Sequence, residues 1–312
     1  MRARTGENYS NLSTTVPSTP LQGVGIGLRP SHASEILSTF PAVDWLELLV
    51  DNHLCNSGFN RAILMPLAEH YPLSLHCVNM DLGGSQPLNR DYFKRLRNLT
   101  NELQPRLISD HISFCRSQDS YLHNLLPLPF TEEALEHISE RIRQAQDLLN
   151  RPLLVENVSR YIDYQHSTLR EGVFMTELAN RTGCQLLIDV NNAFVNQHNH
   201  QHNAYQLLDD LALTAIGEIH LAGFEKRQHF LLDSHASPVA EPVWQLYQEL
   251  CQRLFAAGLD APALIEWDNQ LPPLRTLLDE RQYACNIREQ LLASKLPSTH
   301  TRNISSAANE SK

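Results

Sequence analysis

Short hydrophobic runs alternate with amphipathic stretches along most of the chain. Runs rich in Leu, Ile and Val occur at 23–28, 43–50, 73–78, 106–113, 152–158, 185–190, 216–221 and 263–267. Between several of them, apolar residues recur at helical spacing, at 91–103, 131–149, 172–179, 204–213 and 242–255, which is typical of helices with one buried face. Eight strand-then-helix units in one chain predict an α/β fold, a (β/α)8 barrel of the TIM type, and not an open sheet.

The two ends of the chain lack this alternation. Residues 1–21 are rich in Ser, Thr, Asn and Pro, and residues 296–312 are likewise polar, so we expect two disordered tails. No repeat and no linker-like segment interrupts the sequence between them. We therefore predict a single barrel domain at residues 22–295, flanked by polar N- and C-terminal tails.

Polar and charged residues stand at the end of nearly every predicted strand. Parallel barrel strands are buried on both faces, so a charged side chain inside or just after one needs a reason. The C-terminal ends of barrel strands meet around one mouth, where the activity of this fold resides. We expect four histidines and four carboxylates to converge there: His76, His111, Glu156, Asp189, His220, Asp233, His235 and Glu266.

Four imidazoles and four carboxylates in one place are typical of a metal centre. The mixture suits non-haem iron or manganese better than thiolate-bound zinc or all-oxygen magnesium. One octahedral ion cannot use eight protein ligands and still bind substrate, so the set indicates two or three ions with a bridging carboxylate. Metal ligands also need oriented partners, and the candidates for this supporting role, or for additional ligation, are Asn52, Asp110, His123, Asn157 and Asn192.

Composition narrows the classes of function. The 15 histidines outnumber the 12 glycines, which a histidine-rich site would explain. A formal net charge of −10, from 25 Lys and Arg against 35 Asp and Glu, leaves no broad basic face for nucleic acid. The six cysteines form no C-x-x-C pair, so we expect reduced, mostly buried thiols. Without a secretory signal or a membrane-length apolar run, we expect a cytoplasmic protein that does not enter a membrane.

Three further features have simpler interpretations than the functional ones they suggest. The segment N-Q-H-N-H-Q-H, with His198, His200 and His202, resembles a second metal tract, but a solvated loop is favoured. The glycines of G-V-G-I-G, with Glu47 on the next strand, superficially resemble a dinucleotide-binding turn, but the third glycine is misplaced and a crowded first strand is favoured. Cys77 should point away from the neighbouring histidine, as a buried structural thiol.

Seven motifs in a fixed order give the chain a specific resemblance. They are S-L-H, S-D-H, L-L-V-E-N, L-L-I-D-V-N-N, I-H-L-A-G, D-S-H and I-E-W-D. With them, residues 23–292 resemble the multinuclear non-haem iron-dependent oxidative enzymes (MNIO), which include the bufferin- and methanobactin-type peptide maturases. The resemblance implies a TIM barrel with two or three iron ions, in mixed Fe(II) and Fe(III) states, and O2 as co-substrate. The eight residues listed above match the family's iron ligands, with Glu156 as candidate bridge and Glu156, Asp189 and His220 as candidate catalytic residues.

The resemblance also implies a substrate and a partner. Members oxidise cysteines in ribosomally made precursor peptides, giving oxazolone-thioamide or thiooxazole groups. They usually work with a small protein that recognises the peptide leader, and an exposed edge or β-hairpin would suit its docking. The chain departs from the family pattern at Cys77 with Asn79, at Phe224, and at D-S-H in place of D-T-H. The first two departures are candidates for lining the peptide channel, so the precursor peptide stays undefined.

Two other functions stay open at this point. Xylose-isomerase-like and endonuclease-like barrels also gather His, Asp and Glu at strand ends, so a metal-dependent hydrolase or isomerase is one alternative. A noncatalytic metal-binding protein that uses segment 198–202 is the other. Oxygen consumption separates an oxidase from a hydrolase, and loss of activity on His76→Ala or Glu156→Ala separates an enzyme from a metal buffer.

Overall fold

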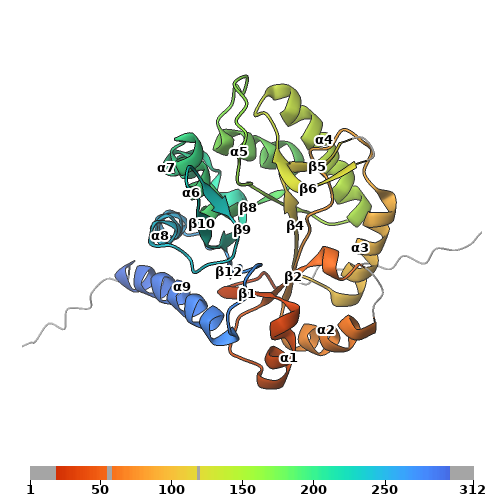
Figure 1. The fold of residues 1–312 in the computed structure, drawn as a ribbon, viewed down its shortest axis with the longest axis vertical. Coiled ribbons are helices and arrows are strands. Elements are labelled where there is room, and N and C mark those ends of the chain that lie inside the picture. Colours follow the sequence, from red (N-terminus) through yellow and green to blue (C-terminus); the bar gives the residue numbers. More distant parts are fainter. Residues whose placement is uncertain (1–18, 55–57, 118–119, 296–312) are drawn as a thin grey trace, which may run out of the picture.

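The computed structural model describes residues 19–54, 58–117 and 120–295. Eight parallel strands close into a barrel in the order β1-β12-β9-β8-β7-β4-β3-β2, and helices form a ring around them (Figure 1). This arrangement confirms the predicted (β/α)8 barrel. Residues 1–18 and 296–312, which make up nearly all of the two predicted tails, lie outside the described residues.

Each barrel strand coincides with one of the predicted hydrophobic runs. The strands are β1 (Val24–Leu28), β2 (Leu46–Leu49), β3 (Leu73–His76), β4 (Leu107–His111), β7 (Leu154–Glu156), β8 (Gln185–Asp189), β9 (Ile216–Leu221) and β12 (Ala263–Ile265). Their residues are almost all buried, as expected for strands that are covered on both faces. Several runs exceed the strands because flanking apolar residues such as Val43 are buried without joining the sheet.

The helices pack their apolar faces against the outside of the barrel. They are α1 (Pro30–Thr39), α2 (Gly58–His70), α3 (Arg90–Leu103), α4 (Glu132–Leu149), α5 (Glu171–Thr182), α6 (Val190–His200), α7 (Ala204–Asp210), α8 (Glu241–Ala256) and α9 (Leu274–Lys295). Five of them match the predicted amphipathic stretches, and Thr131 caps α4 by accepting a hydrogen bond from the Ala134 N–H. The other four helices, α1, α2, α6 and α9, were not predicted.

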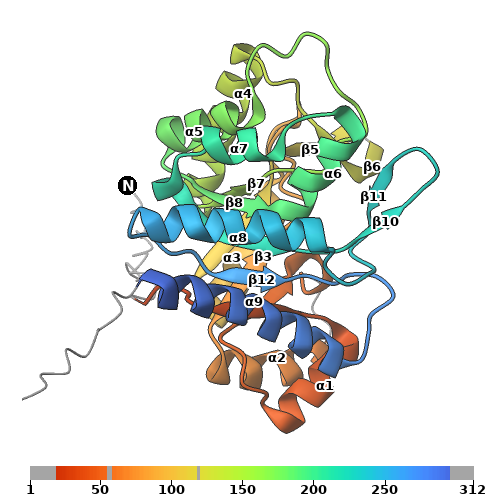
Figure 2. The same cartoon turned by 90° about the vertical axis from the view of Figure 1, so that its left-hand side faces the viewer.

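Two antiparallel hairpins, which the sequence did not predict, extend from one end of the barrel. The first pairs β5 (Ser113–Ser117) with β6 (Ser120–Pro127), directly after β4. The second pairs β10 (Phe224–Lys226) with β11 (Leu231–Asp233), after β9. Both stand at the end where the barrel strands finish, on the right-hand side of Figure 2. They add walls around the mouth in which the predicted site lies.

The opposite end of the barrel is closed by packing around Trp45. Leu21, which was predicted to belong to the N-terminal tail, is instead buried with Trp45 and Leu264, so the fold begins slightly earlier than expected. A Cβ atom on Gly25 would lie 2.4 Å from the Trp45 ring. This contact agrees with a crowded first strand and not with a dinucleotide-binding turn. Among the described residues, we find no helix that is both long enough and apolar enough to span a bilayer.

Candidate metal centre

Seven of the eight predicted ligands meet at the mouth of the barrel. They form overlapping groups whose ligand atoms lie within 4.8 Å of one another. Three of these groups consist only of predicted residues: His76–His111–Glu156, Glu156–Asp189–His220, and Asp189–His235–Glu266. Because neighbouring groups share Glu156 or Asp189, they form one continuous centre and not three separate sites.

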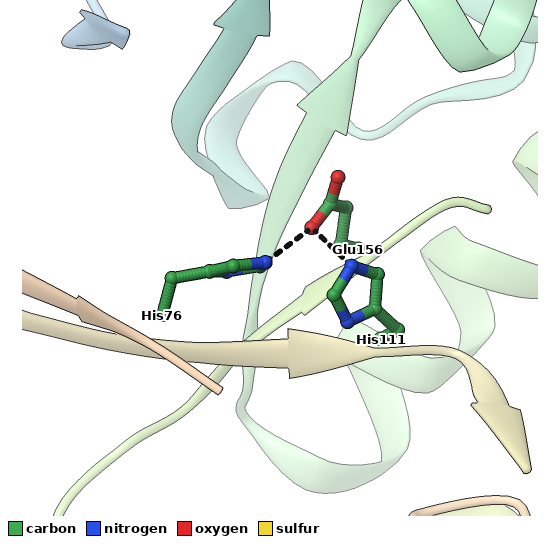
Figure 3. Close-up of side chains that lie close together, drawn as sticks. All are labelled: His76, His111 and Glu156. Carbon is green, nitrogen blue, oxygen red and sulfur yellow. Dashed lines mark ion pairs between the residues drawn. The ribbon is translucent and has the colours of Figure 1, made fainter. Parts of the chain in front are cut away.

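Glu156 lies where two of the groups join. Its Oε2 is 3.5 Å from His76 Nε2 and 3.2 Å from His111 Nε2 (Figure 3). Its Oε1 faces the other way and is 3.9 Å from His220 Nδ1. The two carboxylate oxygens therefore face different histidines, which is the arrangement expected of a carboxylate that bridges two metal ions.

The two histidines of the first group are oriented by neighbours on β4. His76 Nδ1 lies 2.7 Å from Ser109 Oγ, so its Nε2 is directed into the centre. His111 Nδ1 lies 3.5 Å from Asp110 Oδ1. Asp110 is itself buried and accepts a hydrogen bond of 2.8 Å from the Met80 N–H. Asp110 thus lies beside a candidate ligand, as a supporting residue would.

Asp189 is held at the end of β8 by the two predicted asparagines. Asn157 exchanges two hydrogen bonds of 2.9 Å with the backbone of Asp189. Asp189 also caps α6, because its Oδ1 accepts a hydrogen bond of 2.8 Å from the Asn192 N–H. Its second oxygen, Oδ2, is left facing the centre, 3.9 Å from His235 Nε2.

Asp233 is the predicted ligand that falls outside these groups. Its Oδ1 lies 2.8 Å from His235 Nε2 and accepts a hydrogen bond of 2.8 Å from Asn191 Nδ2. Its Oδ2 accepts a hydrogen bond of 3.0 Å from Ser159 Oγ. Asp233 therefore lies beside the centre, in contact with His235. That histidine has a left-handed backbone, with φ of 46°, which an L-residue rarely adopts.

Two predicted supporting residues lie farther out. Asn52 is exposed in the 3-10 turn Val50–Asn52 after β2 and is not among the residues that line the cavity above the centre. Its neighbour Asp51 takes the supporting role, because its carboxylate accepts hydrogen bonds from the Val78 N–H (3.0 Å) and Asn79 Nδ2 (2.7 Å) after β3. His123 lies on β6 and lines the mouth, with φ of 53°.

Two buried carboxylates of the site were not predicted from the sequence. Glu47 Oε2 and Glu218 Oε1 each lie 3.4 Å from His220 Nε2, on the side opposite Glu156. Glu47 also forms a group with His220 and Glu266 that is compatible with a metal ion. Strand alternation provided a usable signal, because Glu218 and His220 are two residues apart and share a face. Glu47 was recognisable as a charge inside the hydrophobic run L-E-L-L.

Burial and charge shift the protonation of the centre. Burial raises the pKa of Glu156 to about 8 and that of Asp189 to about 7. Burial would lower the pKa of His111, but the carboxylates of Glu156 and Asp110 outweigh it and raise this pKa to about 9. Burial, together with the charge of His111, holds the pKa of His76 well below its ordinary value. Without a metal, the centre therefore binds protons that a cation would displace.

The chemistry of these side chains fits a cluster of iron ions. Several buried atoms make no well-aligned hydrogen bond among the described residues, although some lie close to an opposite charge: Glu156 Oε2, Asp189 Oδ2, His220 Nε2, His235 Nε2 and both oxygens of Glu47. Buried polar atoms are costly when they are unpaired, and bound cations would satisfy them. A purely nitrogen and oxygen set of donors suits iron or manganese.

A cavity of about 660 Å³ opens above the centre. Its floor includes His76, His111, Glu156, His235 and Glu266, and its walls include residues 123–127 of β6 and 232–235 at the end of the second hairpin. The two departures that were expected to line the peptide channel, Cys77 with Asn79 and Phe224, do not line this cavity. Cys77 directly follows β3 and is fully buried, and burial raises its pKa. The Phe224 ring packs against the Phe194 ring, with the ring centroids 5.4 Å apart.

The histidine-rich segment is a structural feature of α6. His198 and His200 belong to the last turn of this helix, so the predicted solvated loop is wrong in its secondary structure. His200 Nε2 lies 2.7 Å from the Arg160 carbonyl oxygen, and His202 Nε2 lies 3.1 Å from Asp163 Oδ2. Within the described chain, none of the three joins a metal-compatible group. Each of the five cysteines described has a free thiol, and Cys55 lies outside the described residues.

Comparison with known proteins identifies the family. Two solved structures of low sequence identity share the fold. A D-psicose 3-epimerase from Clostridium cellulolyticum has a TM-score of 0.58 and 14% identity, and the match covers 87% of this chain and 99% of that one. Endonuclease IV from Thermus thermophilus has a TM-score of 0.53 and 14% identity, and the match covers 88% of this chain and 100% of that one.

Sequence relatives and a family model show the family. A UPF0276 protein of Acaryochloris marina is 41% identical over 88% of this chain and 99% of its own length, and one of Vibrio vulnificus is 40% identical over 88% of this chain and 92% of its own length. The family model described as RiPP precursor modification enzyme MbnB/TglH/ChrH matches residues 23–289. The chain therefore belongs to this family of enzymes, which modify the precursors of ribosomally synthesised and post-translationally modified peptides (RiPPs).

Proposed function

We propose that this protein is an iron- and O2-dependent enzyme that oxidises cysteine residues of a ribosomally synthesised precursor peptide. The observation that carries the proposal is the sharing of Glu156 and Asp189 between three groups of metal-compatible side chains. Sharing of this kind places metal ions side by side, as an oxidation that uses more than one iron requires. The product is of the oxazolone-thioamide or thiooxazole type.

The residues have distinct roles in this proposal. The groups His76–His111–Glu156, Glu156–Asp189–His220 and Asp189–His235–Glu266 would hold two or three irons, in mixed Fe(II) and Fe(III) states. Asp233 would be an additional iron ligand if its contact with His235 Nε2 were broken. When bound, the iron supplies the oxidising chemistry with O2, and the protein supplies binding and orientation. Glu156, Asp189 and His220 are the proposed catalytic residues because they surround the middle of the centre.

The mouth is the proposed binding site for the peptide. Its floor is polar and its walls carry apolar side chains such as Leu126, Val158 and Ile162, a distribution typical of sites that exclude water around a reacting group. The two hairpins offer strand edges on which a small leader-recognition protein would dock. We place the reaction in the cytoplasm, where peptide thiols stay reduced.

Mass spectrometry of a candidate precursor tests the proposal. The iron-loaded protein is incubated with O2 and a synthetic cysteine-containing peptide encoded next to its gene. Oxidation should lower the peptide mass through loss of hydrogen, in step with O2 uptake, and Glu156→Gln should abolish both. A metal-dependent hydrolase or isomerase would act equally well without O2, and that result would reject the oxidase. A noncatalytic metal-binding protein would leave the peptide unchanged.

A further inference from the structure

Strand β1 contributes an arginine to the mouth of the barrel, whereas other strands contribute ligands. Arg29 follows β1 directly, and its side chain is only 5% exposed. Its Nε donates a hydrogen bond of 2.8 Å to Asp268 Oδ1, and its Nη2 also contacts this oxygen. The same Nη2 lies 3.3 Å from Glu266 Oε1. One buried guanidinium therefore binds a candidate metal ligand and the carboxylate two residues after it.

Asp268 in turn contacts His235. Its Oδ2 lies 3.1 Å from His235 Nδ1. The backbone N–H groups of Asp268 and Asn269 also donate hydrogen bonds to the His235 carbonyl, at 2.8 and 3.1 Å. Side chain and backbone of the histidine are thus both fixed by residues 268–269. The left-handed backbone of His235 needs such support, because it is unfavourable for a residue other than glycine.

The contact also bears on which nitrogen of His235 binds a metal ion, because Nδ1 lies beside two carboxylates, Asp268 Oδ2 at 3.1 Å and Glu266 Oε2 at 3.4 Å. A carboxylate at Nδ1 fixes the proton on that nitrogen, which leaves Nε2 as the nitrogen available to a metal ion. In the structure, His235 Nε2 is directed toward Asp233 and Asp189, at 2.8 and 3.9 Å. The positive charge of Arg29 offsets two carboxylates at once, which makes their close approach in a buried place tolerable.

From this geometry we infer that Arg29 and Asp268 are positioning residues for one part of the centre. They hold His235 and Glu266 in place for the group Asp189–His235–Glu266, and neither belongs to a metal-compatible group itself. The inference rests on the proposed iron centre. It goes beyond that centre because it makes one iron depend on the Arg29–Asp268 pair, while the group His76–His111–Glu156 does not.

Iron titration of Asp268→Asn and Arg29→Lys tests the inference. The metal-free proteins are titrated anaerobically with Fe(II) against a competing chelator, and Mössbauer spectra count the iron sites. Both variants should bind one iron about 10- to 100-fold more weakly, the usual effect of losing a partner of a metal ligand. The affinity of the group His76–His111–Glu156 for its iron should not change. Unchanged affinity at every site, or equal weakening at all of them, would overturn the inference.

The pair Arg288 and Asp260 provides a matched control. Arg288 is also buried and lies 2.5 Å from Asp260, but Asp260 precedes β12 and stands at the opposite end of the barrel from Asp268. Asp260→Asn and Arg288→Lys should lower the unfolding temperature without changing the iron affinity. If Asp268→Asn does not fold, Arg29→Lys, which keeps the charge, still tests the inference. A wild-type protein that binds no iron would reject the proposed function as well, whereas wild-type iron binding with unaltered variants rejects the inference alone.

Discussion

Asn157 holds the backbone of Asp189 from both sides. Its Oδ1 accepts a hydrogen bond from the Asp189 N–H, and its Nδ2 donates one to the Asp189 carbonyl, each at 2.9 Å. Asn157 directly follows Glu156 at the end of β7. Its side-chain amide therefore joins the ends of β7 and β8, where the shared carboxylates Glu156 and Asp189 are located. The spacing between Glu156 and Asp189 is therefore fixed both by the pairing of β7 with β8 and by this buried side chain.

Replacement of this asparagine should weaken the middle of the centre. Asn157→Ala leaves both backbone groups of Asp189 unpaired and should cost about 1–3 kcal/mol of folding free energy. It should also lower iron affinity about 10- to 100-fold, because the ligand loses its orientation. Chemical unfolding and chelator competition measure the two effects.

Asn199→Ala is a suitable control for that experiment. Asn199 makes the same pair of hydrogen bonds with the backbone of Leu231, at 2.8 and 3.0 Å, and Leu231 does not line the mouth. The control should lose similar stability and keep its iron. Equal loss of iron in the two variants would mean that the hydrogen bonds between Asn157 and the Asp189 backbone have no specific role in iron binding.

Loss of the negative charge on Glu156 should weaken metal binding at both groups that share this residue. Glu156→Gln keeps the size of the side chain, but an amide does not bridge two cations. We expect at least one iron fewer per chain and at least about 100-fold lower activity, since bound metal contributes several kcal/mol to a reaction. Elemental analysis and peptide oxidation rates measure these effects, and full activity in the variant would exclude Glu156 as the bridge.

Iron binding should strengthen as the pH rises. The carboxylates of Glu156 and Asp110 outweigh burial and raise the pKa of His111 to about 9, and burial raises that of Glu156 to about 8. Both groups must lose their proton to bind iron, so apparent affinity should rise by up to roughly tenfold per pH unit for each proton released. Anaerobic Fe(II) titrations at pH 6, 7 and 8 test this, and a pH-independent affinity would contradict it.

The metal-free protein should show the opposite trend in stability. The pKa of His111 rises on folding from 6.5 to about 9, and that of Glu156 from 4.5 to about 8. The folded state thus binds more protons than the unfolded state in this range, so the stabilisation is present at low pH and is lost as the pH rises through 8 and 9. The unfolding temperature of metal-free protein should fall between pH 6 and 9. A rise over the same interval would show that these groups are not paired as described.

His123 offers a way to separate peptide binding from iron binding. Its φ of 53° suits glycine, so His123→Gly removes the ring without straining the backbone and should not lower the unfolding temperature. The residue lines the mouth but joins no metal-compatible group. We therefore expect a several-fold higher KM for the precursor peptide with unchanged iron content. Loss of iron would instead place His123 at the metal.

The barrel and most of the centre were predictable because both depend on periodic patterns. Buried parallel strands produce continuous apolar runs, and a charge at the end of such a run, as at Asp189, is conspicuous. The hairpins were not predictable in this way. Only Ile112 separates β4 from β5, and no Gly or Pro marks a turn between them, so the two strands appeared as one run at 106–113.

Arg29 and Asp268, unlike the missed Glu47 and Glu218, act through contacts that no local pattern encodes. Arg29 reaches Asp268 across 239 positions of sequence, and only closure of the barrel brings β1 beside β12. Asp51 and Asn52 both follow β2, and only the 3-10 turn decides which of them is exposed. Residues at strand ends were therefore predicted better than the residues that orient them.

Metal analysis of the purified protein tests the central claim most directly. The protein is produced with iron in the medium, its metals are quantified, and its Mössbauer spectrum is recorded before and after exposure to O2. We predict at least two irons per chain that are close enough to couple magnetically, as expected if Glu156 and Asp189 are shared. One tightly bound zinc per chain, with no iron, would contradict the account.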